Sequence, residues 1–318
     1  VMDQSQPPLP GPRNRPGKVI GVHLNYRSRA AQRGRTPAFP GYFLKPASSL
    51  SESGTPIERP AGTELLAFEG EIAIVIGTAV RRIDPADAWS AVSGVTAAND
   101  FGVYDLRLSD KGSNVRSKGG DGFTPLGPRM IPAGAIDPAA LRIRTWVNGE
   151  LVQEDTTADL LFPFAQLVAD LSQQLTLEPG DVILTGTPAG ASVVQPGDVV
   201  EVEVDAPTAA GSPTTGRLTT PIAAGTTPIP PYSAPPLVTD EQQADAWGSA
   251  EAAGLEPAFT LTDELGAKLN SVGTATLSSQ LRKHGYNAVS IDGLASTHPG
   301  ARLVGRARTL RFIPVRED

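Results

Sequence analysis

Short apolar runs, separated by glycine and proline, recur along the first two thirds of the chain. Each run is about four to seven residues long and is rich in alternating or β-branched residues, which is typical of strands. The 33 glycines and 30 prolines fall mostly between these runs, as turn residues do. The predicted strands cover residues 19–24, 71–76, 141–147, 182–185, 199–204 and 218–222. The pattern therefore predicts a mixed α/β fold that is rich in strands.

Helical periodicity is clear in one segment. The apolar residues from Leu160 to Leu175 follow the i, i+3, i+4, i+7 spacing of one helix face, which predicts a helix over about 158–175. A second, shorter helix is predicted over 85–92, with Asp84 as its N-cap.

Composition changes twice along the chain and predicts its domains. Residues 1–18 form a proline-rich tail, 19–222 a first domain, and 223–238 an extended linker rich in Ala, Pro and Thr. Residues 239–318 form a second unit, with helices predicted near Thr262 or Asp263 and over 276–283, and a strand over 302–313. This second unit is short and stops just after a strand, so we expect the natural protein to be longer.

Charge and residue counts exclude several kinds of site. With 27 basic and 34 acidic residues the net charge is −7, and no basic block is present, so we expect no nucleic-acid partner. The absence of cysteine excludes disulfides and thiolate metal sites, and it fits a cytoplasmic protein. No apolar run approaches the roughly 20 residues of a membrane span, so no membrane partner is expected. Of the three histidines only His23 lies in the first two thirds, which argues against a Ser-His-Asp triad or a multi-histidine zinc site there.

The best candidate site is formed by Glu69 and Glu71, at the start of an apolar strand. Residues two apart on a strand point to the same face, so the two carboxylates repel each other and lose solvation. A hard cation such as Mg²⁺, with Mn²⁺ or Ca²⁺ as alternatives, would relieve both effects. Asp100, 29 residues after Glu71, could supply a third carboxylate. The alternative is a pair of solvated glutamates at a strand edge.

Two glycine-containing loops are further candidates. Lys118 begins the Lys-Gly-Gly-Asp-Gly segment that includes Asp121. Near a cation its pKa would be depressed, and it could stabilise an enolate. The turn around Gly186 and Thr187 offers backbone N–H groups and a hydroxyl to a carboxylate or phosphate, although it lacks the lysine of a phosphate-binding loop. An ordinary surface lysine and a plain tight turn are the alternatives.

Several segments together resemble the fumarylacetoacetate hydrolase family, in that family's order, over about residues 19–222. The matching segments are GVHLNYRSRAAQRG (21–34), FLKPASSL (43–50), FEGEIAIVIG (68–77), SGVTAANDF (93–101), KGGDGFTPLGP (118–128), VNGELVQEDTTADLLF (147–162), LSQQLTLEPGDVILTGTPAG (171–190) and QPGDVVEVEV (195–204).

This resemblance implies a β-roll around a magnesium site, in a homodimer or larger homo-oligomer. It implies substrates that are small 2-oxo or 2-enol carboxylic acids, which chelate the metal. It nominates Glu69, Glu71 and Asp100 as metal ligands and Lys118 as the enolate-stabilising cation. The remaining nominated substrate contacts are Thr187, Gly186, Lys45, Asp121 and Tyr104.

The chain departs from the family's hydrolases where these commonly carry a water-activating His and Glu. Arg29 and Gln32 stand there, and neither can act as a general base at neutral pH. Tyr104 stands where an arginine is common. The similarity is greatest to the subgroup of 5-carboxymethyl-2-hydroxymuconate isomerases and decarboxylases of aromatic catabolism.

We therefore expect a magnesium-dependent isomerase, or a decarboxylase, of 2-hydroxymuconate or 2-oxo-dienoic acids, with His23 as candidate base. A fumarylacetoacetate or acylpyruvate C–C hydrolase, and a non-catalytic regulator with a vestigial metal site, are the alternatives. For His23 itself, the alternative is a structural histidine bonded to backbone.

The end of the chain resembles a different family. Residues 262–318 are similar to the beginning of regulator of ribonuclease activity A and the 4-hydroxy-4-methyl-2-oxoglutarate aldolases, through the segments 269–294 and 302–318. The match stops before that family's catalytic Gly-Arg-Asp segment. The expected fold is thus a β-roll followed by a partial α/β domain.

Overall fold

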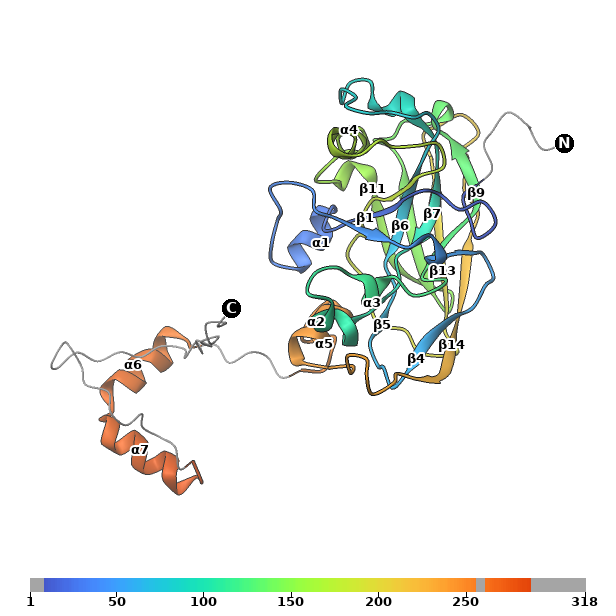
Figure 1. Ribbon diagram of the computed structural model, residues 1–318. Coiled ribbons are helices and arrows are strands. Elements are labelled where there is room, and N and C mark those ends of the chain that lie inside the picture. Colours follow the sequence, from blue (N-terminus) through green and yellow to red (C-terminus); the bar gives the residue numbers. More distant parts are fainter. Residues whose placement is uncertain (1–8, 256–260, 287–318) are drawn as a thin grey trace, which may run out of the picture. The chain divides into compact units, whose positions relative to one another are not determined.

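The apolar strand predicted after Glu69 lies at the centre of the larger sheet in the computed structural model, which describes residues 9–255 and 261–286. Strand β6 (Gly70–Ile76) is buried along its whole length and pairs with β12 on one side and β7 on the other (Figure 1). The seven strands of this sheet, in spatial order, are β2 (Tyr42–Lys45), β1 (Val19–Val22), β12 (Val182–Leu184), β6, β7 (Val92–Asn99), β9 (Thr124–Pro132) and β3 (Leu50–Glu52).

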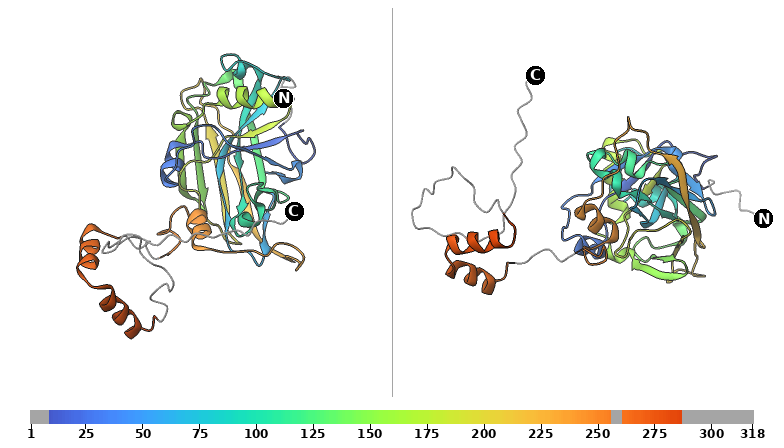
Figure 2. Two further views of the ribbon diagram at one scale, coloured as in Figure 1. Left: turned by 60° about the vertical axis from the view of Figure 1, so that its left-hand side comes forward. Right: turned by 90° about the horizontal axis from the view of Figure 1, so that it is seen from below.

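A second, five-stranded sheet packs against the first. Contacts join β6 and β7 of the large sheet to β10 and β13 of the small one, and the strands curl around the shared interior (Figure 2). A further two-stranded ribbon pairs β5 (Leu66–Ala67) with β8 (Gly102–Val103). The order in the small sheet is β11 (Glu150–Thr156), β10 (Arg142–Val147), β13 (Val199–Asp205), β14 (Leu218–Pro228) and β4 (Ile57–Ala61). The fold is thus mixed α/β and strand-rich, as the sequence predicted.

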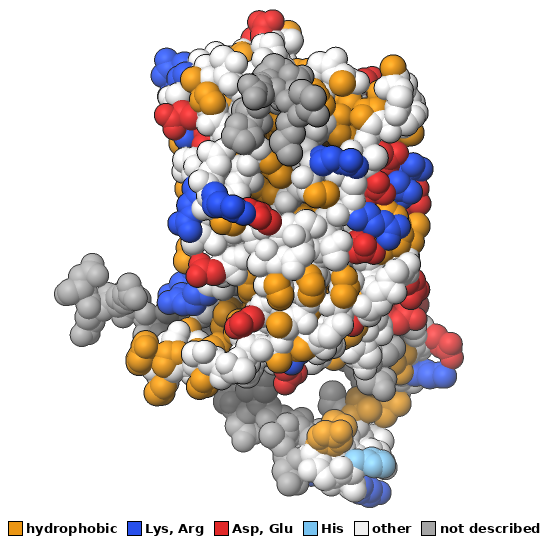
Figure 3. All heavy atoms as spheres, turned by 90° about the vertical axis from the view of Figure 1, so that its right-hand side faces the viewer, with side chains coloured by type: hydrophobic (Ala, Val, Ile, Leu, Met, Phe, Trp, Pro, Cys, Tyr) orange, Lys and Arg blue, Asp and Glu red, His pale blue; other side chains and the backbone are white. Residues whose placement is uncertain are grey.

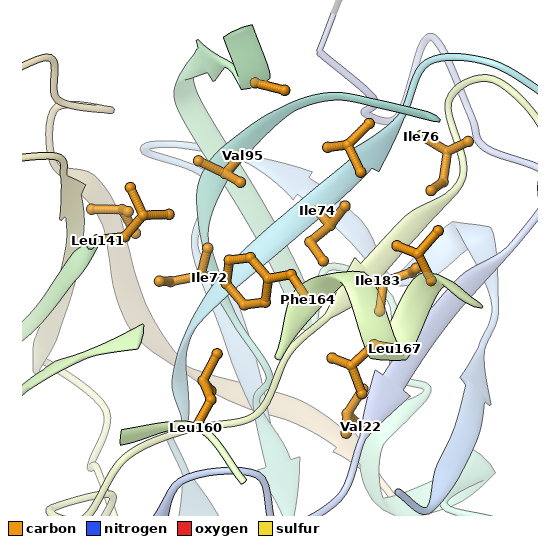
Figure 4. Packing of buried hydrophobic residues seen from close by; sticks show 14 of the residues in the cluster. Val22, Ile72, Ile74, Ile76, Val95, Leu141, Leu160, Phe164, Leu167 and Ile183 are labelled. Atoms are coloured by element: carbon orange, nitrogen blue, oxygen red, sulfur yellow. The ribbon is translucent and has the colours of Figure 1, made fainter. Parts of the chain in front are cut away.

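The main core lies between the sheets and under helix α4 (Phe164–Gln174). Alternation along β6 sends Ile72 and Ile74 to this core, and Figure 4 shows Phe164 of α4 beside them. Ala73 points to the other face, where it joins a smaller apolar cluster. Burial of each such large side chain contributes roughly 1.5–3 kcal/mol, so both faces of β6 are held in place.

Helix α4 begins later than the sequence predicted. Pro163 is its N-cap, and the residues before it form a short 3₁₀ turn, η5 (Thr157–Asp159), and an extended stretch. Leu160 makes a β-bridge with Tyr26, and the Phe162 amide donates to Asn25 Oδ1 at 2.8 Å. The apolar residues before Pro163 are therefore buried as extended chain, and their helical spacing was misleading.

Two other predictions are corrected. The helix predicted over 85–92 is only a 3₁₀ turn, η2 (Ala88–Ala91), because Asp84 Oδ1 accepts from the Ala86 amide at 2.9 Å and closes a local turn instead. The first six residues of the predicted linker, 223–228, belong to β14, which pairs in parallel with β4. Their Ala- and Thr-rich composition is compatible with a strand once a partner strand is present.

Ionic side chains are interspersed over the surface. On the face in Figure 3 acidic and basic side chains lie among neutral and hydrophobic ones. Across the small sheet, arginines pair with carboxylates on neighbouring strands, as in Arg142–Asp205 and Arg144–Glu203. No helix among residues 9–255 and 261–286 is long and apolar enough to cross a membrane.

The chain divides into two compact units, residues 1–256 and 257–318. In the second, the described residues form α6 (Asp263–Ser271), with Thr262 as N-cap, and α7 (Thr274–Lys283). Both helices confirm the prediction. The strand predicted over 302–313 lies outside the described residues, as does the tail before residue 9.

Candidate metal centre and substrate cavity

Strand register brings the three predicted carboxylates together. Gly70 of β6 is paired with Asn99 of β7, so Glu69, Glu71 and Asp100 meet at one end of this strand pair. The Asp100 amide donates to the Glu69 carbonyl oxygen at 2.8 Å and closes the pair at this point. One carboxylate oxygen from each residue lies within 4.8 Å of the other two. Glu71 and Asp100 are buried, and Glu69 is partly buried.

Two lysines contact this acidic cluster. Lys118 Nζ donates to Glu69 Oε2 at 2.6 Å and to Asp100 Oδ2 at 2.5 Å. It comes from the end of the short helix α3 (Val115–Lys118), and its alkyl chain passes close to Gly102, where a Cβ would lie 3.2 Å from Lys118 Cγ. Lys45, at the end of β2, pairs with Asp100 Oδ1 and donates to the Phe123 carbonyl at 3.2 Å.

The charges in the cluster shift the pKa values of its members. Burial alone raises the pKa of Glu69, but the charges of Lys118 and Arg29 outweigh it and lower the pKa to about 2. Burial, followed by the charges of Asp100 and Glu69, raises the pKa of Glu71 well above its ordinary range. Three acidic groups thus share one buried space, and Glu71 is the member whose ionisation is least favourable.

The carboxylates that contact Lys118 govern its pKa. Burial lowers the pKa of this lysine, but Asp100 and Glu69 together outweigh burial and raise it. The depressed pKa was predicted for a lysine beside a bound cation and stays a prediction, since here two carboxylates contact the ammonium directly. Lys118 is a protonated donor at neutral pH.

The donor set fits a hard divalent metal ion. With all three carboxylates ionised, the two ammonium groups leave one negative charge in the cluster. Glu71 also accepts a backbone hydrogen bond from Gly186 at 2.7 Å. A cation among the three carboxylates would stabilise the ionised form of Glu71, which burial and its neighbours disfavour. Oxygen-only ligands favour Mg²⁺, Mn²⁺ or Ca²⁺.

A cavity opens beside the acidic cluster and receives most of the predicted site residues. Helix α1 (Arg27–Gln32), helix α2 (Arg107–Asp110) and α3 flank it, together with the 3₁₀ turn η3 (Tyr104–Leu106). Its lining includes Glu69, Glu71, Asp100, Lys118, His23, Tyr104 and Thr187. The Tyr104 hydroxyl donates to Glu69 Oε1 at 2.8 Å, which ties this lining residue to the cluster.

Three predicted contacts lie outside the cavity lining, and one of them is Gly186, whose amide donates to Glu71 Oε2 at 2.7 Å. Lys45 is buried behind Asp100 and is not part of the cavity wall, so the structure gives it a charge-balancing position. Asp121 is exposed on its loop and also lies outside the cavity. The loop direction explains this, because Lys118 points inward from the end of α3 while the following glycines turn the chain away.

Sequence reasoning missed several cavity residues, including three charged ones that contact one another. Arg33, Arg107 and Asp245 line the cavity, and Asp245 comes from helix α5 (Asp240–Trp247), beyond the predicted first domain. The several arginines of residues 27–35 were a signal, because a run of basic residues beside a predicted anion site indicates recognition of carboxylates. No comparable signal marked Asp245.

The two positions of the missing His and Glu lie on α1 and contact each other. Arg29 is buried, lines the cavity and donates from Nη1 to Gln32 Oε1 at 2.5 Å. Arg29 thus contributes a cationic side chain to the cavity wall, and its partner Gln32, which is exposed, carries an amide that cannot act as a general base.

Comparison with known proteins agrees with this geometry. The family model "Fumarylacetoacetate (FAA) hydrolase C-terminal" matches residues 18–223, and the chain belongs to this family. Among curated relatives, a 4-hydroxyphenylacetate degradation bifunctional isomerase/decarboxylase of Escherichia coli is 42% identical over 204 residues, which is 64% of this chain and 47% of the relative. The chain spans about half the length of the curated isomerase/decarboxylases it matches.

Solved structures of the family are also similar. A 5-carboxymethyl-2-hydroxymuconate delta-isomerase from Mycobacterium smegmatis is 38% identical, with a TM-score of 0.58, over 67% of this chain and 80% of that one. A maleylpyruvate hydrolase from Sphingobium sp. SYK-6, in complex with manganese(II) and pyruvate, is 33% identical, with a TM-score of 0.54, over 66% and 72%. These likenesses confirm the resemblance and the fold that the motifs indicated.

Proposed function

We propose that this protein is a magnesium-dependent isomerase, or a decarboxylase, of 2-hydroxymuconate-type and 2-oxo-dienoic acids. The observation that carries this proposal is Arg29, hydrogen-bonded to Gln32, in the wall of a cavity that also contains the acidic cluster and Lys118. A double-bond shift moves one proton and needs no water nucleophile. Loss of the water-activating pair is therefore compatible with isomerisation.

Glu69, Glu71 and Asp100 would hold the magnesium ion. When bound, the ion would supply a Lewis acid, which the oxygens of the 2-oxo acid end of the substrate could chelate and which would stabilise the enolate form. Lys118 is kept protonated by its carboxylate neighbours and lines the same cavity. We assign it the electrostatic stabilisation of the enolate oxygen by its positive charge.

Thr187 is oriented to bind the substrate carboxylate. Its Oγ1 accepts a hydrogen bond from Gln153 Nε2 at 2.9 Å, and Gln153 is itself fixed by the Gly70 amide at 3.2 Å. Because the hydroxyl oxygen is used as an acceptor, its proton is free to be donated into the cavity. The Gly186 amide is instead occupied by Glu71, so we assign Gly186 to the support of that metal ligand.

His23 is the candidate acid–base group. It lies at the cavity rim, and its ring is 4.9 Å from that of Phe43. Partial desolvation and the nearby Lys118 lower its pKa from the ordinary 6.5, so the imidazole is neutral at pH 7 and can accept a proton. In this role His23 takes the proton of the 2-hydroxyl group and returns one to carbon.

We also propose a homodimer or larger homo-oligomer. Strand β2 is an edge of the large sheet, and it exposes Leu44 beside a loop that exposes 81% of Phe39. Apolar side chains at a sheet edge are typical of an interface between subunits. Light scattering coupled to size-exclusion chromatography tests this, and a monomer at all concentrations would contradict it.

The decisive experiment is product analysis by NMR. The protein is incubated with 5-carboxymethyl-2-hydroxymuconate and Mg²⁺, with a chelator in a parallel sample. We expect a metal-dependent shift of the double bond without cleavage, whereas loss of carbon dioxide would identify the decarboxylase. No metal-dependent change would contradict both activities.

A C–C hydrolase is the second candidate, and the similarity to a maleylpyruvate hydrolase favours it. Acylpyruvates are the corresponding substrates to test. The double substitution Arg29→His with Gln32→Glu restores the two residue types that activate water in the family's hydrolases. If the rest of the site is hydrolytic, it raises cleavage of acylpyruvate; if the site is an isomerase, cleavage stays at background.

A further inference from the structure

Helix α5 lies beyond the family domain, which ends at residue 223, but it packs against the cavity. Its N-terminus is closed by a capping box between Thr239 and Gln242. Just before it, the Leu237 amide donates to the Asp105 carbonyl at 2.9 Å, and on the helix Ala246 is buried in an apolar cluster that includes Tyr104. The helix is therefore held against the residues of the family domain at several points.

Asp245 on this helix binds two arginines that line the cavity. Its carboxylate pairs with Arg33 Nη1 through Oδ1, and with Arg107 Nη1 through Oδ2 at 3.1 Å. Its backbone carbonyl also accepts from Arg33 Nη2 at 2.7 Å. One carboxylate thus fixes two guanidinium groups that come from distant parts of the chain.

Tyr104 connects these arginines to the acidic cluster. Arg33 Nη2 donates to the Tyr104 hydroxyl at 3.2 Å, and that hydroxyl donates to Glu69. The Arg107 guanidinium lies 4.5 Å from the centre of the Tyr104 ring. Two positive charges against one negative charge leave this part of the wall attractive to a further anion.

A guanidinium carries five N–H donors, and the contacts named here use three of those on Arg33. The two side chains can therefore bind a second carboxylate while Asp245 holds them. Because Tyr104 connects Arg33 to Glu69, this anion site and the metal cluster lie on one cavity wall. A substrate with a carboxylate at each end fits such an arrangement.

We propose that Asp245 is a positioning residue, which orients Arg33 and Arg107 to bind the second carboxylate of a 2-oxo dicarboxylic acid. The proposal rests on the proposed function for the placement of the 2-oxo end at the metal. It makes α5, a segment outside the family domain, part of the substrate site.

The test is isothermal titration calorimetry on the full chain loaded with Mg²⁺, with 2-oxoglutarate as the dicarboxylate probe and pyruvate as the monocarboxylate probe. Wild type should bind 2-oxoglutarate more tightly than pyruvate. Asp245→Asn should lower the affinity for 2-oxoglutarate about tenfold and the affinity for pyruvate less than twofold. Asp245→Glu should restore most of the lost affinity. Asp240→Asn, which removes the same charge from the exposed first turn of α5, should change neither affinity.

A thermodynamic cycle distinguishes positioning from a structural role. In an Arg107→Gln background, Asp245→Asn should lower the affinity for 2-oxoglutarate clearly less than it does in wild type, because one of the two arginines that Asp245 holds is gone. Equal losses for both probes, no loss, or no initial preference for the dicarboxylate would overturn the proposal. A gain in 2-oxoglutarate affinity would also overturn it, since Asp245 would then compete with the ligand.

These outcomes are separable from the proposed function. If no double-bond shift occurs but Asp245 controls the dicarboxylate preference, the isomerase proposal fails and the positioning role stands. If the double-bond shift occurs and Asp245→Asn leaves both affinities unchanged, the isomerase proposal stands and the positioning role of Asp245 fails.

Discussion

The Asp100 amide donates a hydrogen bond to the Glu69 carbonyl oxygen at 2.8 Å, where strands β6 and β7 end side by side. This backbone contact joins two residues 31 positions apart and sets the spacing of their carboxylates. The acidic cluster is therefore built into the register of the sheet. Substitutions of the metal-ligand candidates, of Lys118 and of residues in the sheet should therefore have distinguishable effects on metal binding, activity and stability.

Glu71→Gln should weaken Mg²⁺ binding by more than about tenfold, because it removes one ionic ligand and leaves an amide in a buried site; second-sphere changes alone typically cost 10- to 100-fold. Calorimetric titration with Mg²⁺ measures this. Glu64→Gln, at an exposed glutamate nearby, is the matched control and should bind as wild type does. Unchanged affinity in Glu71→Gln would place the metal elsewhere.

Lys118→Met should lower kcat by roughly 100- to 1000-fold, the usual effect of removing one donor to a developing oxyanion. Mg²⁺ affinity should not fall, because the ammonium that contacts Glu69 and Asp100 is a competing cation. Steady-state kinetics and metal titration are measured on the same sample. Lys111→Met, at an exposed lysine, is the control, and a parallel loss of metal binding in Lys118→Met would indicate a structural role.

Gly70→Ala should destabilise the fold by about 1–3 kcal/mol and disturb the metal site, because overpacking forces the backbone to shift. A Cβ at Gly70 would lie 2.1 Å from Thr145 Oγ1 on the facing strand β10, and Gly70 stands between two metal-ligand candidates. Chemical denaturation measures the unfolding free energy. Gly134→Ala meets no atom within 4 Å and should stay within about 0.5 kcal/mol of wild type. Equal stability of both variants would contradict the packing.

His23 should give kcat/KM an acid limb. A general base works in its neutral form, and the pKa of His23 lies below the ordinary 6.5, so activity should be full at pH 7 and fall as the pH drops through that lower pKa. A pH profile of kcat/KM from 5 to 8 measures it. His23→Gln should lower activity and flatten this limb, whereas His284→Gln, an exposed histidine of the second unit, should leave it intact. An unchanged limb in His23→Gln would exclude His23 as the base.

Phe164→Ala should lower the unfolding free energy of the first unit by about 3–5 kcal/mol, as for other buried aromatic residues. The side chain is 2% exposed and stacks near Trp89, with ring centroids 6.2 Å apart. Tryptophan fluorescence during urea unfolding measures the change. Gln174→Ala, at the exposed end of the same helix, should have an effect below about 0.5 kcal/mol. A small loss in Phe164→Ala would mean that α4 contributes little to the core.

Local pattern was sufficient for most strands and for the pairing of Glu69 with Glu71, whereas strand register brings Asp100 to them. Residues 71–76 and 199–204 were predicted as strands because β-branched apolar runs fit a buried pleated surface, and β6 and β13 confirm them. Glu69 and Glu71 could be placed on one face from the two-residue period alone. The local pattern failed where a proline or a partner strand decided the outcome, as at Pro163 and in residues 223–228.

The sequence by itself determined where the apolar strands lie along the chain and that carboxylates outnumber the histidines available as metal ligands. It also determined the family to which residues 18–223 belong. Only the tertiary structure decided that Lys118 lies between two carboxylates, that Lys45 lies behind Asp100, and that Asp245 reaches the cavity. The physical reason is that periodicity reports which face of its own element a side chain occupies. The charges and donors it meets come from elements distant in the chain, and only folding brings them within hydrogen-bonding distance.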